Sequence, residues 1–365
     1  MSTATSWRYW GKWRRPAGNR EKSCRAGSGS GYVRRSRAWV KSRFPREKEE
    51  RARVAEKAKV AFVFPGQGSQ YVGMGKEFFD QFDAARRVFV EAEEALALPL
   101  GRLCFSGPEA ELKLTEYTQP AILTVSIAVL RVLQAESAVA PLCVAGHSLG
   151  EYSALVSVGA LAFGDAVKVV RERGRLMQEA VPAGAGLMAV VLGLGAEDVR
   201  AICGETGQGE VVAPANFNGG GQIVIAGSRQ AVLRTMAAAR ARGAKRVLEL
   251  PVSAPFHCSL MRPAAEGLER VLADVTVKPF SVGVVTNVEA AVNLDHARVK
   301  PLLVEQAVRP VRWEESVKLI EQMGCTRVLE IGPGRVLSGL IKRISPGVRA
   351  ESVESPQDLK KIALD

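Results

Sequence analysis

One stretch decides the fold: residues 142–150, LCVAGHSLG, in which a short apolar run precedes a single serine between two glycines. The apolar run predicts a buried strand, and the Gly-x-Ser-x-Gly spacing is typical of a nucleophile elbow at a strand-to-helix turn. Such a turn exposes the hydroxyl of Ser148 and directs backbone N–H groups of the following helix towards it. We therefore expect Ser148 to be a candidate nucleophile.

Strands and helices alternate on both sides of this stretch. β-Branched and aromatic runs predict strands at 59–64, 142–145, 282–286 and 327–331. Apolar residues at helical spacing predict helices at 75–98, 118–137, 149–158, 163–180, 299–307 and 314–323. This alternation indicates an α/β fold, with a parallel sheet covered by helices as in a hydrolase-like core.

A different order of elements begins after Pro182. The patterns predict strands at 187–194, 211–216, 222–226 and 246–250, with helices at 196–203 and 229–242. The order β-α-β-β-α-β is typical of a ferredoxin-like α+β unit. We expect a large lobe of residues 58–182 and 255–355, an inserted small lobe of residues 183–254, and a C-terminal tail of residues 356–365. The active site is expected in the crevice between the lobes.

The charge of the chain is concentrated at its N-terminus. The net charge is +12, but residues 1–59 hold 18 Lys or Arg against 5 Asp or Glu, and the remainder holds 32 against 33. A nearly neutral body does not favour a nucleic-acid partner, because the phosphate-neutralising charge would lie only in the extension. The hydrophobic content of 47% is that of a globular protein with an ordinary core.

Residues 1–57 form a basic extension without apolar periodicity, and we expect it to be disordered. It has no apolar region of a secretory signal; its Arg and Ser content partly fits an organelle transit peptide, whereas Glu47, Glu49 and Glu50 do not. The two alternatives are a non-conserved or wrongly started extension and a targeting segment. No uninterrupted apolar run of about 18 residues occurs, so no membrane span is predicted.

The six cysteines are scattered, with no C-x-x-C pair and no histidine at ligand spacing. We therefore expect neither a metal site nor a disulfide framework. Free thiols in apolar stretches favour a reducing cytoplasm, and we expect a cytoplasmic monomer.

A serine at neutral pH needs a base, and the chain has three histidines. His147 adjoins Ser148, and neighbouring side chains on an elbow diverge. His296 lies in a polar segment typical of a solvated loop or helix cap. His257 follows the last small-lobe strand, where the chain must return to the large lobe. We therefore expect His257 to be the general base, with a packed structural histidine as the alternative.

Several motifs, in the same order along residues 58–355, resemble those of malonyl-CoA:acyl carrier protein transacylases. They are AFVFPGQGSQ at 61–70, YTQPA at 117–121, GHSLGEY at 146–152, Arg173-Gly174 with Met177-Gln178, and PFHC at 255–258. The resemblance implies a ping-pong transfer in which Ser148, activated by His257, receives the malonyl group of malonyl-CoA. The phosphopantetheine thiol of an acyl carrier protein then collects it, with no metal or redox cofactor, in fatty acid biosynthesis.

The resemblance also implies roles for other residues. Gln67 and the backbone N–H of Leu149 would form the oxyanion hole, and the backbone carbonyl at Gln306 would orient His257 in place of an acid. Arg173 would bind the malonyl carboxylate, which agrees with the fork geometry of a guanidinium. The alternative for Arg173 is a surface cation on a basic helix.

The resemblance implies roles for three further positions. Gln119 would support the carboxylate end of the substrate, and Asn216 would line the interface between the lobes. Phe256 resembles the bulky residue of versions that take malonyl rather than branched methylmalonyl groups.

Three other functions remain to be weighed. A serine esterase or thioesterase would need an acid between Ser148 and His257, and Asp198 and Glu249 fall in that interval. A discrete malonyltransferase of polyketide synthesis would have the same site and a different carrier protein. A scaffold without activity would not be expected to keep both Ser148 and His257.

Overall fold

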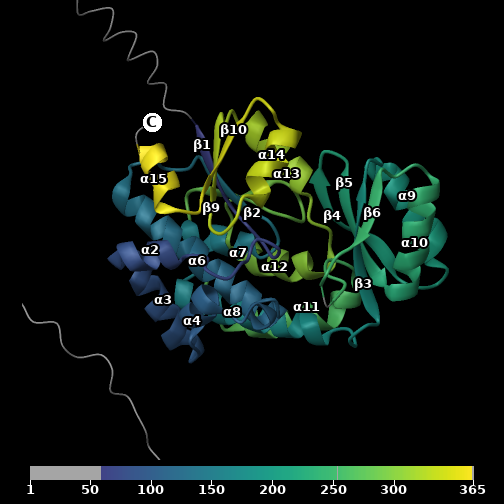
Figure 1. The fold of residues 1–365 in the computed structure, drawn as a ribbon, viewed down its shortest axis with the longest axis horizontal. Helices are drawn as coiled ribbons and strands as arrows, with labels where there is room; N and C mark the ends of the chain where they lie inside the picture. The colour runs from purple at the N-terminus through teal and green to yellow at the C-terminus, as the bar shows by residue number, and fades with distance from the viewer. Residues whose placement is uncertain (1–58, 253, 364–365) are drawn as a thin grey trace, which may run out of the picture. The chain divides into compact units, whose positions relative to one another are not determined.

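The computed structural model describes residues 59–252 and 254–363, and these form two β-sheets with surrounding helices (Figure 1). The predicted extension of residues 1–57 lies outside the described residues. The larger sheet has the strand order β10-β9-β1-β2-β7-β8. Its strands are β1 (Val60–Phe64), β2 (Cys143–Gly146), β7 (Gly283–Val285), β8 (Val292–Asn293), β9 (Arg327–Ile331) and β10 (Arg349–Val353). Every neighbouring pair is parallel except β7 and β8, so the predicted parallel sheet is confirmed, with one antiparallel edge strand.

The central strand β1 shows why helices cover both faces of this sheet. All five of its residues are buried. Phe62 and Phe64 belong to a core shared with α3, α6, α7 and α8, whereas Ala61 and Val63 belong to a second core shared with α13 and α14. Side chains alternate between the faces of a strand, so a continuous apolar run requires a hydrophobic layer on each side.

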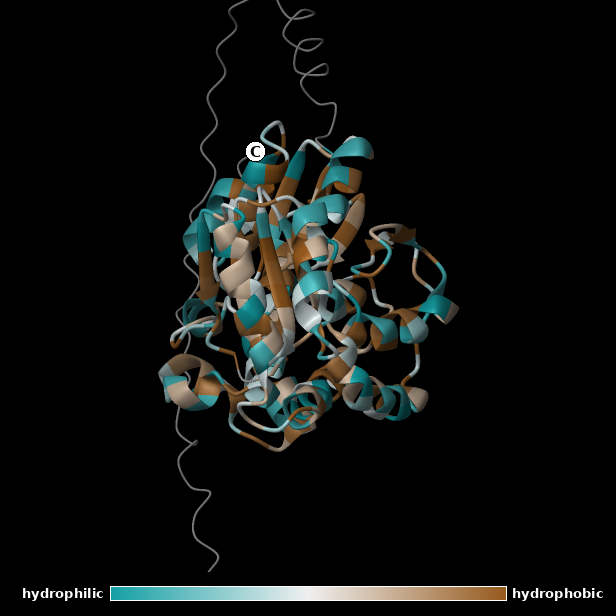
Figure 2. Cartoon of the chain, turned by 90° about the vertical axis from the view of Figure 1, so that its right-hand side faces the viewer, coloured by the Kyte–Doolittle hydropathy of each residue, from teal (hydrophilic) through white to brown (hydrophobic). Residues whose placement is uncertain are grey.

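The helices of this lobe are α2 (Lys76–Gln81), α3 (Asp83–Leu96), α4 (Leu100–Ser106), α5 (Glu109–Leu112), α6 (Thr115–Glu136), α7 (Gly150–Ser157), α8 (Phe163–Glu179), α11 (Arg262–Ala273), α12 (Val299–Val308), α13 (Trp313–Gln322), α14 (Val336–Ile344) and α15 (Pro356–Ala363). Two short 3-10 helices, Ser259–Met261 and His296–Arg298, complete the set. Figure 2 shows hydrophobic and hydrophilic segments on the helices around the sheets, as expected where one side of a helix faces a core.

The predicted single helix over 75–98 is wrong, because the chain breaks between α2 and α3. Phe82 separates them in an extended conformation. Arg86 in α3 donates hydrogen bonds to the carbonyls of Phe79 (2.8 Å) and Asp80 (2.9 Å) at the end of α2. These bonds satisfy carbonyls that an interrupted helix leaves without partners.

The smaller sheet is antiparallel, with the order β4-β5-β3-β6. Its elements are β3 (Gly186–Leu192), α9 (Ala196–Gly207), β4 (Val212–Gly219), β5 (Gln222–Ser228), α10 (Arg229–Ala241) and β6 (Arg246–Glu249). Figure 1 shows this unit on the right, with α9 and α10 outside its sheet. The chain order is the β-α-β-β-α-β order predicted from the sequence. We retain residues 183–254 as the small lobe as a proposal, but Leu359 and Ile362 of α15 are buried in the large lobe's core, so the segment predicted as a C-terminal tail packs with that lobe.

Backbone hydrogen bonds join β4 of the small lobe to the segment that precedes α13 in the large lobe. Phe217 N–H of β4 donates to the Val311 carbonyl, and Val311 N–H donates to the Ala215 carbonyl, both across 2.9 Å. Val311 precedes α13 of the large lobe. The short ladder fixes β4 beside the large lobe.

Helix α6 is long and apolar enough to span a membrane, the only such helix between residues 59 and 363. Of its most apolar window, 83% is buried inside the protein. It packs against α3 and α8, which is the position of a core helix.

Candidate active site

Ser148 lies at a sharp turn between β2 and α7. Its backbone φ is 50°, in the left-handed region that non-glycine residues rarely adopt. A Cβ at Gly146 would overlap the backbone of Gly150, and a Cβ at Gly150 would overlap the carbonyl of Phe64 in β1. The strand, the turn and the helix therefore cross closely enough to require both glycines. The predicted strand-to-helix turn is present.

His257 faces Ser148, with Nε2 of the imidazole 2.8 Å from the serine Oγ. Its other ring nitrogen, Nδ1, lies 2.8 Å from the backbone carbonyl oxygen of Gln306. A carbonyl only accepts hydrogen bonds, so Nδ1 carries the proton and Nε2 presents its lone pair to the hydroxyl. This is the arrangement that a general base requires.

The environment of His257 favours the neutral imidazole. Burial away from water, followed by the positive charge of Arg173, lowers the pKa of His257 to about 3. At neutral pH the ring is therefore unprotonated and can accept a proton. Its backbone φ of 61° is also left-handed, so both members of the pair are held in uncommon conformations.

The sequence explains why the Gln306 carbonyl is available to His257. Gln306 lies in the last turn of α12, and its partner in a continued helix would be the N–H four residues later. That position is Pro310, which has no N–H. His257 occupies a carbonyl that the helix itself cannot satisfy.

The acids that a hydrolase triad would require do not lie beside His257. Asp198 and Glu249 are exposed on α9 and β6 of the small lobe. His257 Nδ1 contacts a carbonyl instead of a carboxylate. The geometry differs in this respect from the Ser-His-Asp arrangement.

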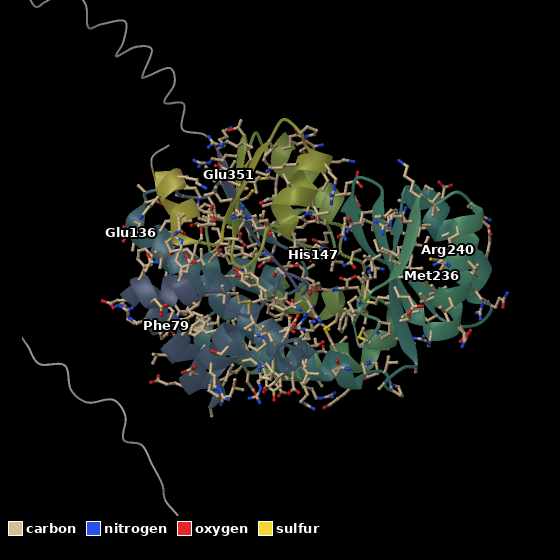
Figure 3. The ribbon with its side chains drawn as sticks, viewed as in Figure 1. Phe79, Glu136, His147, Met236, Arg240 and Glu351 are labelled. Atoms are coloured by element: carbon tan, nitrogen blue, oxygen red, sulfur yellow. The ribbon has the colours of Figure 1, made fainter. Side chains whose placement is uncertain are left out.

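The other two histidines lie elsewhere. Figure 3 labels His147 in the middle of the molecule, and its Nε2 lies 2.9 Å from Oδ1 of Asn218 on β4. His147 therefore points from the elbow to the small lobe. His296 is exposed in a 3-10 helix, where the Asp295 side chain provides the cap.

Arg173 is the most deeply buried cation of the site, with 1% of its surface exposed. Its Nη1 donates to Oε1 of Gln119 on α6 across 2.7 Å, and its Nη2 donates to Ser148 Oγ and to Gln306 Oε1, both across 3.0 Å. It also lies 5.4 Å from the Tyr152 ring centroid. The alternative of a surface cation is therefore wrong.

Two features make this position of Arg173 unusual. Among the described residues, the hydrogen bonds of its two Nη atoms go to amide and hydroxyl oxygens and not to a carboxylate, and its Nε has no hydrogen-bond partner. Burial lowers the pKa of Arg173. Close packing makes the site possible: a Cβ at Gly174 would lie 2.6 Å from the Thr115 carbonyl oxygen, so α8 can approach α6 only with glycine there.

A cavity of about 100 Å³ opens above Ser148. Its walls come from both lobes: Gln67, Gln119, His147, Ser148, Leu149, Arg173, Met177, Met188, Asn216, Leu250, Val252, Phe256 and His257. Cavities of about 150 Å³ bind benzene, so this space fits a short acyl group. All of the predicted site residues except Gln306 line this cavity. Gln306 lies outside it and accepts a hydrogen bond from Arg173.

The two residues predicted to form an oxyanion hole lie on two different turns that follow neighbouring strands, β1 and β2. Leu149 is buried at the start of α7, and Gln67 follows β1. The Gln67 amide donates to Oγ1 of Thr115 across 3.3 Å. Backbone N–H groups at a helix start carry partial positive charge and can stabilise an anionic oxygen.

Two buried residues that the sequence did not single out hold the elbow. The Ser148 N–H donates to Oδ1 of Asn287 across 2.7 Å, and the Asn287 amide donates to the Gly146 carbonyl across 2.6 Å. Oε2 of Glu151 accepts from the Gln306 amide (2.7 Å) and from the Asn287 N–H (3.1 Å). Glu151 lies three residues after the serine, in the first turn of α7. Acidic residues are common and usually exposed at this position of a helix, so the sequence does not predict that Glu151 is buried.

The described residues contain no group of three His, Cys, Asp or Glu side chains arranged to hold a metal ion. Five of the cysteines fall in the described part of the chain, and all five are free and buried.

Comparison with known proteins identifies the family. Residues 61–354 match the acyl transferase domain. This chain belongs to the acyl transferase family. Together with the malonyl CoA-acyl carrier protein transacylases described next, this match confirms the resemblance drawn from the motifs.

Relatives of this acyl transferase match more than four fifths of it and nearly all of their own length. It is 49% identical over 304 residues to the malonyl CoA-acyl carrier protein transacylase of Bacillus subtilis, covering 83% of this chain and 96% of the relative. It is 47% identical to the transacylase of the same name from Escherichia coli K12, covering 81% and 96%.

Solved structures have the same fold. An acyl-carrier-protein S-malonyltransferase from Burkholderia pseudomallei is 48% identical, with a TM-score of 0.82 and coverage of 84% of this chain and 100% of that chain. A malonyl-transacylase solved in complex with a type II PKS acyl-carrier protein is 45% identical, with a TM-score of 0.83 and coverage of 84% and 99%. The predicted α/β fold class is confirmed.

Proposed function

We propose that this acyl transferase moves the malonyl group from malonyl-CoA to the phosphopantetheine thiol of an acyl carrier protein, through a malonyl ester of Ser148. The observation that carries the proposal is a buried Arg173 whose guanidinium contacts the hydroxyl of Ser148. A serine esterase has no need of a buried cation beside its nucleophile. An enzyme for an acyl group that ends in a carboxylate does.

In the first half-reaction, His257 Nε2 accepts the proton of Ser148, and the serine Oγ forms a bond to the thioester carbonyl carbon. The N–H groups at Leu149 and Gln67 stabilise the oxyanion, and one such donor typically contributes about 3 to 4 kcal/mol. The carbon–sulfur bond then breaks, and His257 returns the proton to the coenzyme A thiolate. The malonyl group remains on Ser148.

The second half-reaction reverses these steps with a different thiol. His257 accepts the proton of the carrier protein's thiol, the sulfur attacks the serine ester, and Ser148 Oγ leaves and regains the proton. Both half-reactions exchange one acyl bond for another without a change of oxidation state. We therefore propose that no redox cofactor takes part.

Arg173 selects the substrate in this proposal. Its guanidinium binds the free malonyl carboxylate, and Gln119 holds the guanidinium in place. An acetyl group would leave this buried cation without an anion, which disfavours it. Phe256 and Asn216 line the same cavity, and the bulk of Phe256 disfavours a methyl branch on the acyl group.

We also propose a pathway, a location and an oligomeric state. Transfer to the carrier of fatty acid synthesis is the main candidate, and the relative solved with a type II PKS carrier keeps polyketide synthesis as the second candidate. The free buried thiols support a cytoplasmic location, and we propose a monomer in addition.

Mass spectrometry of the protein mixed with malonyl-CoA tests the proposal. We expect a malonyl adduct on Ser148, no adduct in Ser148→Ala, and transfer of the adduct to added holo carrier protein. Rapid release of free malonate without transfer would instead establish a thioesterase. Parallel assays with fatty acid and polyketide carriers distinguish the two pathways.

A further inference from the structure

Glu151 is a buried carboxylate for which the proposed reaction has no role. It lies in the first turn of α7, three residues after the nucleophile, and 3% of its surface is exposed. Among the described residues its hydrogen bonds come from Gln306 and Asn287 only. A buried carboxylate with so few partners is unfavourable unless a nearby cation offsets its charge.

One amide connects Glu151 to Arg173. Nη2 of Arg173 donates to Oε1 of Gln306 across 3.0 Å, and Nε2 of Gln306 donates to Oε2 of Glu151 across 2.7 Å. The amide oxygen faces the cation and the amide nitrogen faces the anion, so its dipole favours both charges. Arg173 and Glu151 thus interact through the Gln306 amide, without a direct contact.

The charged groups that act on Glu151 are few. Arg173 on α8 attracts a negative charge there, and Glu289, after β7, repels it. Burial dominates over both and raises the pKa of Glu151 to about 7. Around neutral pH a substantial fraction of Glu151 is therefore ionised and partly neutralises the field of Arg173.

A malonyl carboxylate on Arg173 would be a second anion near the same cation. Like charges in a buried site repel each other, and at an effective dielectric constant of about 20 the repulsion still acts across the width of the Gln306 amide. An acetyl group carries no such charge. The charge on Glu151 therefore weakens binding of the malonyl group and leaves binding of the acetyl group unaffected.

We infer that Glu151 is a specificity-determining residue: through Gln306 it offsets the charge of Arg173 and so moderates the preference for acyl groups that end in a carboxylate. The inference rests on the proposed function. It assigns Glu151 an effect on selectivity in addition to its part in holding Gln306 and Asn287.

The variant Glu151→Gln isolates the charge. Both hydrogen bonds are accepted by the same oxygen, Oε2, and a glutamine amide oxygen can take its place. We expect the ratio of kcat/KM for malonyl-CoA to that for acetyl-CoA to increase about tenfold. Glu151→Ala loses the charge and both bonds, so the ratio should increase while both rates fall.

Glu330 provides the matched control. It is also a fully buried glutamate, but it accepts from Leu337 N–H, Ser338 N–H and Ser338 Oγ at the start of α14. Glu330→Gln should leave the malonyl-to-acetyl ratio unchanged. Circular dichroism of all three variants shows whether each is folded.

The outcomes separate the inference from the proposed function. Equal losses for both acyl groups in folded Glu151→Gln, or a smaller ratio, would overturn the inference and leave Glu151 a structural residue. If the wild type formed no malonyl adduct at all, the proposed function would fail. Calorimetric binding of free malonate would still test the inference, because Glu151→Gln should bind it more tightly than the wild type.

Discussion

Arg173 donates a hydrogen bond to the hydroxyl of Ser148, with 3.0 Å between Nη2 and Oγ. The same hydroxyl lies 2.8 Å from His257 Nε2 on another side. A cation beside the serine oxygen favours the negative charge that develops as the imidazole takes the proton. One guanidinium can thus act on both the nucleophile and the substrate's carboxylate.

Arg173→Ala should lower kcat/KM for malonyl-CoA by about 10- to 100-fold, from a charge-assisted bond of roughly 1.5 to 3 kcal/mol. Activity with acetyl-CoA should fall much less. Steady-state assays with both substrates measure the difference. Arg175→Ala is the control, because Arg175 is exposed on the same helix and pairs with Glu172 and Glu179. Equal losses with the two substrates would show that Arg173 does not select the acyl group.

The pH dependence of malonyl-enzyme formation should reflect the lowered pKa of His257. A base with a pKa of about 3 stays unprotonated down to that value, so the rate should not fall as pH decreases from 8 to 5. Arg173→Ala removes one cause of the lowered pKa and should move the acid limb to higher pH. Rapid-quench measurements across this range test both statements. If the wild-type rate fell with an apparent pKa near 6.5, the burial of His257 beside Arg173 would not lower the pKa of its imidazole.

Gly146→Ala should destabilise the protein, because its Cβ would overlap the backbone of Gly150. Overpacking of this kind costs about 1 to 3 kcal/mol, or more where backbone must move. Urea unfolding gives the loss. Gly204→Ala in α9 is the control, since open space surrounds Gly204 and alanine favours helix by about 1 kcal/mol. Unchanged stability of Gly146→Ala would mean that the elbow can relax.

The free energy of unfolding should depend on Glu151 between about pH 4.5 and 7. Its pKa is raised on folding, so the folded state binds the proton more tightly, and the resulting stabilisation is complete below pH 4.5 and lost as pH increases to 7. The contribution is on the order of 3 kcal/mol. Unfolding of wild type and Glu151→Gln at pH 5 and pH 7.5 isolates it. If the free energies of unfolding of the two proteins changed equally with pH, the pKa of Glu151 in the folded protein would lie near its ordinary value.

The sequence predicted those parts of the fold that depend on local patterns. The apolar runs of β1 and β2 and the glycines around Ser148 act over a few residues, and the β-α-β-β-α-β order follows from successive patterns. Strand β10 was missed because RAESV holds only two apolar residues and breaks the alternation at Ser352, so it forms neither an apolar run nor a period-two pattern. The break at Phe82 was missed because α2 and α3 keep similar apolar spacing.

The site was predicted where chemistry limits the choice of residue. Three histidines left one plausible base, and the resemblance pointed to Arg173. Asn287 and Glu151 were not identified, because only the folded chain shows that they meet Ser148 and Gln306. Their contacts span more than 130 residues of sequence, which no local pattern reports.

The bond between His257 and the backbone of Gln306 has a genetic consequence. Every amino acid supplies a main-chain carbonyl, so no point mutation at position 306 can delete the acceptor that orients the imidazole. A triad that relies on an aspartate is lost through a single codon change. Here the sensitive position is Pro310: another residue there would allow α12 to continue past Arg309, and its N–H could then compete for the same oxygen.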